Sequence, residues 1–191
     1  MLKSGYEYVN SNEEFNKNLY FCRMFQSKTM RNTFITLTAV TAALFAACTP
    51  KTKVEPCVDV TTSVSQSDSI ALKNFIDQNN IEATYDSRGF YYRVHTQGTG
   101  RVPGQCAVVV TDYTGKLVNG TVFDSRNNIT MTMRDLIPGF RMGASLFKEG
   151  SEFTIYLPPS LGYGNNDNGS IPGGSILIFK IKLNSITQEI K

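Results

Sequence analysis

The chain has 191 residues, of which 41% are hydrophobic and 18% charged, and this composition is typical of a globular protein rather than a disordered or multi-pass membrane protein. Its 19 basic and 16 acidic residues leave a net charge of +3, and residues 48–191 carry 14 basic and 13 acidic groups. Because no basic surface is left to neutralise phosphates, we expect no nucleic-acid partner.

An apolar run near the N-terminus is typical of a secretory signal. The run reads FITLTAVTAALFAA over residues 34–47, and the basic residues Lys28 and Arg31 precede it. It is shorter than the roughly 20 residues that a membrane-spanning helix needs. We therefore predict a signal peptide over residues 30–47. Residues 1–29 are then an upstream extension, either because the start codon is placed too early or because the chain has a genuine cytoplasmic extension.

The end of this run, LFAAC over residues 44–48, resembles the lipobox of bacterial lipoproteins, although Phe45 stands where that pattern usually has Leu. The resemblance implies that Cys48 carries a diacylglyceryl group and anchors the chain in the bacterial cell envelope. In the lipoproteins that this segment resembles, an Asp after the Cys favours the inner membrane. Thr49 stands at that position here, so the resemblance implies the outer membrane, with the domain facing the periplasm. Ordinary signal cleavage near Ala47 and an uncleaved anchor are the alternatives.

Residues 48–66 are rich in Pro, Thr, Ser and Lys, which predicts a lipidated flexible tether. Cys57 lies in this tether and Cys106 in a predicted strand. An oxidising compartment would allow them to pair, but a flexible tether fixes no geometry, so we expect both thiols to be free. The chain has one histidine, His95, on the polar face of a predicted strand, and its cysteines lack CxxC spacing. We expect no metal site and no cofactor.

A short amphipathic helix is predicted over about 68–79, after an N-cap signal at Ser67 and Asp68. Apolar residues then recur at helical spacing: Leu72, Phe75 and Ile76. This helix forms a lead-in segment, residues 67–87, to a domain over residues 88–191.

The domain shows the period of two that is typical of strands. The predicted strands cover residues 90–95, 105–118, 121–124, 129–133, 153–157 and 175–186. Asn119 and Gly120 predict a type I′ hairpin turn, and a short helix is expected from near Phe140 to Gly150. The expected fold is therefore α+β, with an antiparallel five- or six-stranded sheet wrapped around one short helix.

The segment PPSLGYGNNDNGSIPGG, residues 158–174, is a long loop without a predicted element. Loops of this length are usually functional or disordered. Because Tyr163 and Ile171 lie among Pro and Gly, we favour a shaped binding loop over a solvated hairpin connection.

Six short motifs occur in an order that resembles the FKBP-type peptidyl-prolyl cis–trans isomerases. They are YTG (113–115), FDS (123–125), LIPGF (136–140), LPPSLGYG (157–164), IPGGS (171–175) and ILIFKIKL (176–183). The resemblance covers roughly residues 88–187. It implies an FKBP-like fold and an enzyme that accelerates rotation about X–Pro bonds in exported proteins. Its partners would be proline-containing polypeptides, and we expect a monomer.

The resemblance also implies a site. It assigns catalytic roles to Tyr113, Asp124 and Tyr163, and a backbone N–H for the substrate to Ile137. The other residues implied for the proline pocket are Phe123, Met131, Leu136, Phe140, Ile171 and Phe179. Phe140 stands where the family usually has Trp at the pocket floor, and Met131 stands where Phe is common. These two departures keep open a non-catalytic chaperone or docking module with the same fold, and a structural lipoprotein that uses its sheet edge is a third possibility.

Overall fold

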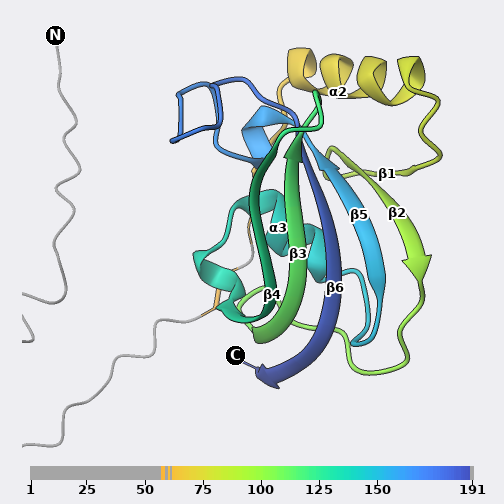
Figure 1. Cartoon of the computed structure of the whole chain (residues 1–191), viewed down its shortest axis with the longest axis vertical. Coiled ribbons are helices and arrows are strands. Elements are labelled where there is room, and N and C mark those ends of the chain that lie inside the picture. The colour runs from red at the N-terminus through yellow and green to blue at the C-terminus, as the bar shows by residue number, and fades with distance from the viewer. Residues whose placement is uncertain (1–56, 59, 61, 190–191) are drawn as a thin grey trace, which may run out of the picture. The chain divides into compact units, whose positions relative to one another are not determined.

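The computed structural model describes residues 57, 58, 60 and 62–189. The predicted signal peptide, the upstream extension and Cys48 lie outside the described residues. The described part forms a six-stranded antiparallel sheet with the strand order β1-β2-β5-β6-β3-β4 (Figure 1). Two α-helices of the described residues pack against it, so the predicted α+β architecture is confirmed.

The elements follow the chain in simple order. The strands are β1 (Thr84–Asp86), β2 (Phe90–Thr96), β3 (Val108–Leu117), β4 (Val122–Thr132), β5 (Glu152–Leu157) and β6 (Leu177–Gln188). The helices are α2 (Gln66–Gln78) and α3 (Pro138–Ala144), with short 3-10 helices η1 (Met133–Asp135) and η2 (Pro159–Leu161).

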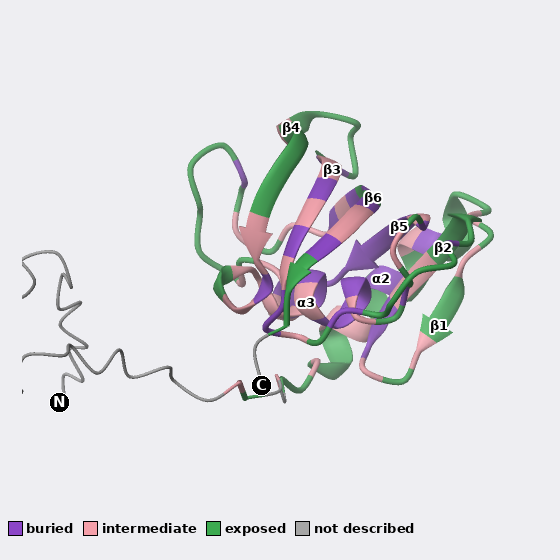
Figure 2. Cartoon of the chain, turned by 90° about the horizontal axis from the view of Figure 1, so that it is seen from below, coloured by how far each residue is buried: buried purple, intermediate pink, exposed green. Residues whose placement is uncertain are grey.

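The main core lies between α3 and one face of the sheet. Figure 2 shows buried residues along the central strands β5 and β6 and at α3, while β1 and β4 at the edges are largely exposed. Two glycines let the helix approach β5. A Cβ at Gly139 would lie 2.6 Å from Leu157 Cδ2, and one at Gly143 would lie 2.9 Å from Ile155 Cγ2. Any larger residue there would push α3 away from the sheet.

The second helix packs on the opposite face. Leu72 and Ile76 of α2 cluster with Tyr156, whose neighbours Ile155 and Leu157 point toward α3. The helix begins two residues earlier than predicted, because Ser65 is its N-cap and accepts a hydrogen bond from Asp68 N at 3.1 Å. The expected cap at Ser67 and Asp68 was therefore wrong.

The predicted hairpin turn and the predicted end of α3 also need correction. Of Asn119 and Gly120, only Gly120 has a positive φ, 87°, and its N–H donates to Leu117 O, so the hairpin does not have the expected type I′ turn. Helix α3 ends at Ala144 rather than near Gly150, which instead adopts a φ of 88° in the turn before β5. Gly150 does adopt the left-handed backbone conformation that often ends a helix, but it does so in the turn before β5 and not at the end of α3.

The largest correction concerns the cysteines. Cys57 and Cys106 form a disulfide, with a Cα–Cα distance of 5.8 Å. The flanking chain is also attached to the domain, because Val60 N donates to Gln105 Oε1 at 3.1 Å. Arg141 of α3 donates from Nη2 to Val58 O at 3.0 Å. This part of the predicted tether is therefore fixed on the domain, and the expectation of free thiols was wrong.

Candidate functional site

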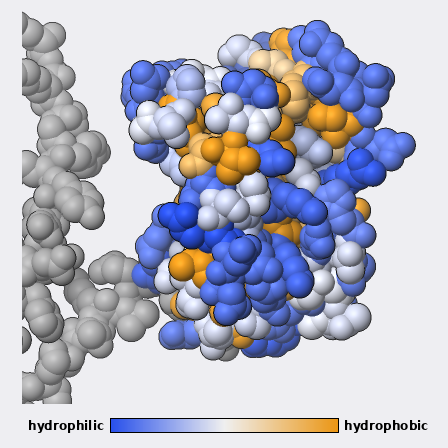
Figure 3. Space-filling model, in the orientation of Figure 1, coloured by the Kyte–Doolittle hydropathy of each residue, from blue (hydrophilic) through white to orange (hydrophobic). Residues whose placement is uncertain are grey.

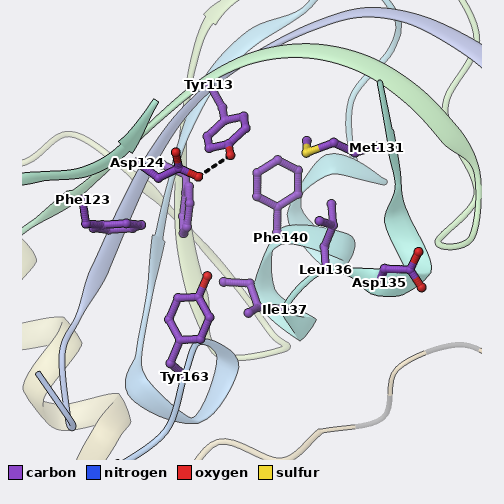
Figure 4. A pocket seen from close by; sticks show the side chains of 10 residues that line it. Tyr113, Phe123, Asp124, Met131, Asp135, Leu136, Ile137, Phe140 and Tyr163 are labelled. Carbon is purple, nitrogen blue, oxygen red and sulfur yellow. Dashed lines mark hydrogen bonds between the residues drawn. The ribbon is translucent and has the colours of Figure 1, made fainter. Parts of the chain in front are cut away.

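A hollow with a volume of about 160 Å³ opens where β3, β4, α3 and the loop after β5 meet (Figure 4). Its lining comes from residues far apart in the sequence: Tyr113, Phe123, Asp124, Met131, Asp135, Leu136, Ile137, Phe140, Tyr163 and Phe179. Most of these side chains are apolar or aromatic, so the hollow is suited to a small apolar group.

The aromatic rings of the hollow contact one another edge to face. The Phe179 ring lies 5.5 Å from Phe140 and 5.5 Å from Phe123, centre to centre, with interplanar angles of 82° and 83°. The Tyr113 ring meets Phe140 in the same way at 6.1 Å. Edge-to-face pairs each contribute about 0.5–1.5 kcal/mol beyond burial, so the rings hold one another in place.

A glycine in β3 creates the space for two of these rings. Gly115 pairs with Asp124 of β4 and with Phe179 of β6. A Cβ at this position would lie 2.5 Å from the tip of the Phe123 ring and 3.0 Å from Phe179 Cε1. The third residue of the YTG motif is therefore required by the packing of the pocket walls rather than by a turn.

Tyr113 and Asp124 bring polar atoms to the lining of the hollow, and Arg126 pairs with Asp124 from outside it. The Tyr113 hydroxyl donates to Asp124 Oδ2 at 2.5 Å, drawn as the dashed line in Figure 4. Arg126 Nη1 lies 3.0 Å from the other carboxylate oxygen of Asp124. Burial, the hydrogen bond to Asp124 and the charge of that carboxylate raise the pKa of Tyr113 to about 12. Tyr113 therefore remains a protonated hydrogen-bond donor at neutral pH.

This raised pKa predicts a loss of stability at high pH. The folded protein binds the Tyr113 proton more tightly than the unfolded chain, in which a tyrosine titrates near pH 10. The stability that this group contributes is fully present below about pH 10 and is lost as the pH rises through about 12. We expect the free energy of unfolding, measured by urea denaturation, to fall less steeply across this window in Tyr113→Phe than in the wild-type protein. Burial also raises the pKa of Tyr156 and of Tyr163, so some slope should remain, but identical slopes would contradict the prediction.

Tyr163 lies at the mouth of the hollow on the loop that follows η2 (Figure 4). The loop is shaped by its backbone: Gly162 N and Gly164 N both donate to Pro159 O at 2.9 Å, and Gly174 N donates to Gly164 O at 2.9 Å. The Tyr163 side chain is 40% exposed. Its hydroxyl is therefore available to a bound molecule.

The structure brings together nine of the ten residues expected from the sequence. Ile171 is the exception, because it is buried in the main core and does not line the hollow. Asp135 was missed, although it stands directly before the LIPGF motif in η1. Ile137 is the N-cap of α3, and within the described residues its N–H makes no backbone hydrogen bond.

His95, expected on the polar face of a strand, does not line the hollow. His95 is exposed, and its Nε2 lies 2.8 Å from Thr154 Oγ1 on the outer face of the sheet. Over the residues that the structure describes, no group of three or more His, Cys, Asp or Glu side chains is arranged to hold a metal ion. No helix within the same residues is long and apolar enough to cross a membrane.

Comparison with known proteins identifies relatives of this domain. Residues 100–184 match the family model described as FKBP-type peptidyl-prolyl cis-trans isomerase. The FKBP-type peptidyl-prolyl cis-trans isomerase FkpA of Aeromonas hydrophila is 38% identical over 102 residues, which are 51% of this chain and 38% of the relative. The outer membrane protein MIP of Legionella longbeachae is 37% identical over 103 residues, 51% of this chain and 44% of the relative. The chain thus spans less than half the length of these relatives.

Solved structures agree on the fold. The crystal structure of FkpA from Escherichia coli superposes with a TM-score of 0.59 and 26% identity, over 64% of this chain and 60% of that one. The crystal structure of AtFKBP13 gives a TM-score of 0.53 at 26% identity, over 56% of this chain and 99% of that one.

Proposed function

We propose that this chain, whose residues 100–184 match the model of the FKBP-type peptidyl-prolyl cis-trans isomerase family, is a member of that family and accelerates rotation about X–Pro bonds in exported polypeptides. The prolyl ring would bind in the hollow between α3 and the β3–β4 hairpin.

One observation carries the proposal: the hollow is apolar and has the size of a small ring. Its volume of about 160 Å³ is close to the roughly 150 Å³ of an engineered apolar cavity that takes up benzene. A pyrrolidine ring is of similar size and has no polar group to satisfy. The crossed rings of Phe140, Phe179 and Phe123 therefore supply a matching surface.

Such a hollow lowers the barrier without a nucleophile. Rotation about a peptide bond is opposed by about 18–20 kcal/mol because amide resonance must be broken. The planar amide carries extra negative charge on its oxygen, which water stabilises, whereas the twisted form is less polar. A site that excludes water therefore disfavours the planar state more than the twisted one. Each 1.36 kcal/mol removed from the barrier gives about a tenfold faster rotation.

Polar groups at the rim would orient the substrate. The Tyr163 hydroxyl and the Ile137 N–H are both available as donors to substrate carbonyl groups. Asp124 would lie near the twisting bond, with its charge compensated by Tyr113 and Arg126. None of these groups needs to gain or lose a proton during the reaction, so catalysis by positioning and desolvation is sufficient.

The test is an exchange measurement on the full-length protein with a proline-containing peptide, followed by NMR. Uncatalysed X–Pro isomerisation takes about 10–100 s at 25 °C, so a catalytic effect is easily resolved. We expect acceleration by the wild-type protein and at least a tenfold loss of kcat/KM in Phe123→Ala, which removes a half-buried wall of the hollow.

Val122→Ala is the matched control, because Val122 precedes Phe123 in β4, is 51% exposed and does not line the hollow. It should leave kcat/KM unchanged. A folded wild-type protein that binds the peptide without accelerating exchange would instead assign the chain to the non-catalytic docking class, which the Phe140 and Met131 departures had kept open.

We further propose that Cys48 anchors the chain by a lipid in the bacterial cell envelope. The support is the lipobox-like sequence before Cys48, together with the name of the Legionella longbeachae relative, which is an outer membrane protein. Mass measurement of the mature chain purified from membranes tests both the start at Cys48 and the acylation. A mature chain that begins elsewhere, or that carries no added lipid mass, would exclude the anchor.

A further inference from the structure

Helix α2 contacts both ends of the loop that carries Tyr163. At the start of the loop, Asp68 Oδ2 accepts a hydrogen bond from Ser160 N at 3.0 Å. At its end, Ile176 packs with the cluster formed by Leu72 and Ile76 of α2. Figure 1 shows α2 and this loop at the same end of the sheet, and Figure 3 shows hydrophobic side chains gathered toward that end. Helix α2 therefore contacts the loop beside the hollow as well as the sheet.

The Asp68 carboxylate is used in an unusual way. Asp68 stands three residues after the N-cap Ser65, the position whose side chain usually returns a hydrogen bond to the cap residue. Here the cap is formed in one direction only, from Asp68 N to Ser65 Oγ, while the carboxylate reaches to Ser160 instead. A hydrogen bond to a charged acceptor is about twice as strong as a neutral one. The sequence 65–68 therefore caps the helix and holds a distant loop.

Within the described residues, the side chain of Ser160 does not help to hold η2 in place. Within the described residues its hydroxyl is buried and makes no hydrogen bond, so its N–H bond to Asp68 is the polar link between η2 and α2. From η2 the link continues through Pro159 O, which accepts from Gly162 N and Gly164 N on either side of Tyr163. The Tyr163 hydroxyl makes no hydrogen bond within the same residues, so the hydrogen bonds that position this residue are those of the loop backbone around it.

We infer that Asp68 is a positioning residue for the proposed isomerase reaction: through Ser160 and η2 it sets Tyr163 at the mouth of the hollow. This inference rests on the proposed function. It assigns a role in the reaction to a helix that lies outside residues 100–184, the part of the chain that matches the family model.

The test is a double-mutant cycle between Asp68→Ala and Tyr163→Phe, with kcat and KM measured separately on the full-length protein. We expect Asp68→Ala to lower kcat/KM about fivefold to tenfold, and to have little further effect once the Tyr163 hydroxyl is removed. Asp68→Asn keeps an oxygen acceptor for Ser160 N and should restore most of the activity. Ser65→Ala is the matched control, because it weakens the same helix end without touching Ser160.

The loss of activity in Asp68→Ala must be distinguished from a general loss of stability. The NMR signals of the Tyr163 ring and the Gly164 amide should shift in Asp68→Ala and remain in place in Ser65→Ala. Equal losses of kcat/KM in Asp68→Ala and Ser65→Ala, or additive effects of Asp68→Ala and Tyr163→Phe, would overturn the inference. If the wild-type protein shows no isomerase activity, the proposed function fails, and unshifted Tyr163 signals in Asp68→Ala would then refute the positioning role on their own.

Discussion

Replacing Cys57 by Ser is expected to lower the free energy of unfolding by about 4 kcal/mol. The disulfide joins residues separated by 49 positions, and closing a loop of about 50 residues removes chain entropy worth about 4 kcal/mol from the unfolded state at 25 °C. The hydrogen bonds of this segment to Gln105 and Arg141 cannot compensate, because each contributes only about 1 kcal/mol net. Urea denaturation of the oxidised wild-type protein and of Cys57→Ser measures the difference.

A reducing agent provides the internal control. It should bring the wild-type protein down to the stability of Cys57→Ser and leave the variant itself unchanged. Cys57 is the better site to replace, because Cys106 is 1% exposed and a serine there would bury a hydroxyl group. A difference below about 1 kcal/mol between oxidised and reduced wild-type protein would show that the attached segment is held by its other contacts.

The sequence could not predict this disulfide, for a physical reason. A stretch rich in Pro, Thr and Ser, with few apolar residues, contains no periodic signal, so it predicts a flexible tether. Tertiary contacts hold this stretch in place. Arg141 of α3 donates to Val58 O and to Gln105 O, and so joins the segment next to Cys57 to the segment next to Cys106. Contacts between residues more than 30 positions apart leave no trace in local spacing.

Elements with a strong period were predicted well. Leu177, Phe179, Ile181 and Leu183 alternate along β6 and are all buried, as the period of two requires. Strand β1 was missed because its three residues are too few to show a period. The contact of α2 with the loop that carries Tyr163 was missed for a related reason, since helical spacing identifies which face of a helix is buried but not what its first turn contacts.

The residues of the candidate site were also predicted only in part. The rings of Tyr113, Phe123 and Phe140 were found because each lies in a motif that resembles one known family. Ile171 lies in such a motif too, yet it packs into the core, because resemblance transfers a position and not the direction of a side chain. Asp135 had only its place before Leu136 as a signal, and an exposed carboxylate in a short helix is common elsewhere on protein surfaces.

Gly115→Ala is expected to reduce kcat/KM at least tenfold while changing stability little. The new Cβ would lie 2.5 Å from the tip of the Phe123 ring, a distance that no packed structure tolerates. Phe123 is only half-buried, so its ring can swing toward solvent at small cost, and alanine is otherwise favoured over glycine within a strand. The hollow, however, loses a wall and the edge-to-face contact with Phe179, and a loss of about 1.4 kcal/mol in binding the twisted amide corresponds to tenfold in rate.

Gly120→Ala in the same hairpin separates activity from stability. Gly120 has a φ of +87°, and a Cβ there would meet nothing within 4 Å, so the substitution strains the backbone without reaching the hollow. We expect it to lower the free energy of unfolding by about 1 kcal/mol and to keep kcat/KM. When peptide exchange and urea denaturation are measured on both variants, Gly115→Ala should lose activity and keep its stability. Gly120→Ala should keep its activity and lose stability. If Gly115→Ala kept full activity, or lost it only in proportion to stability, the aromatic hollow would not be where catalysis occurs.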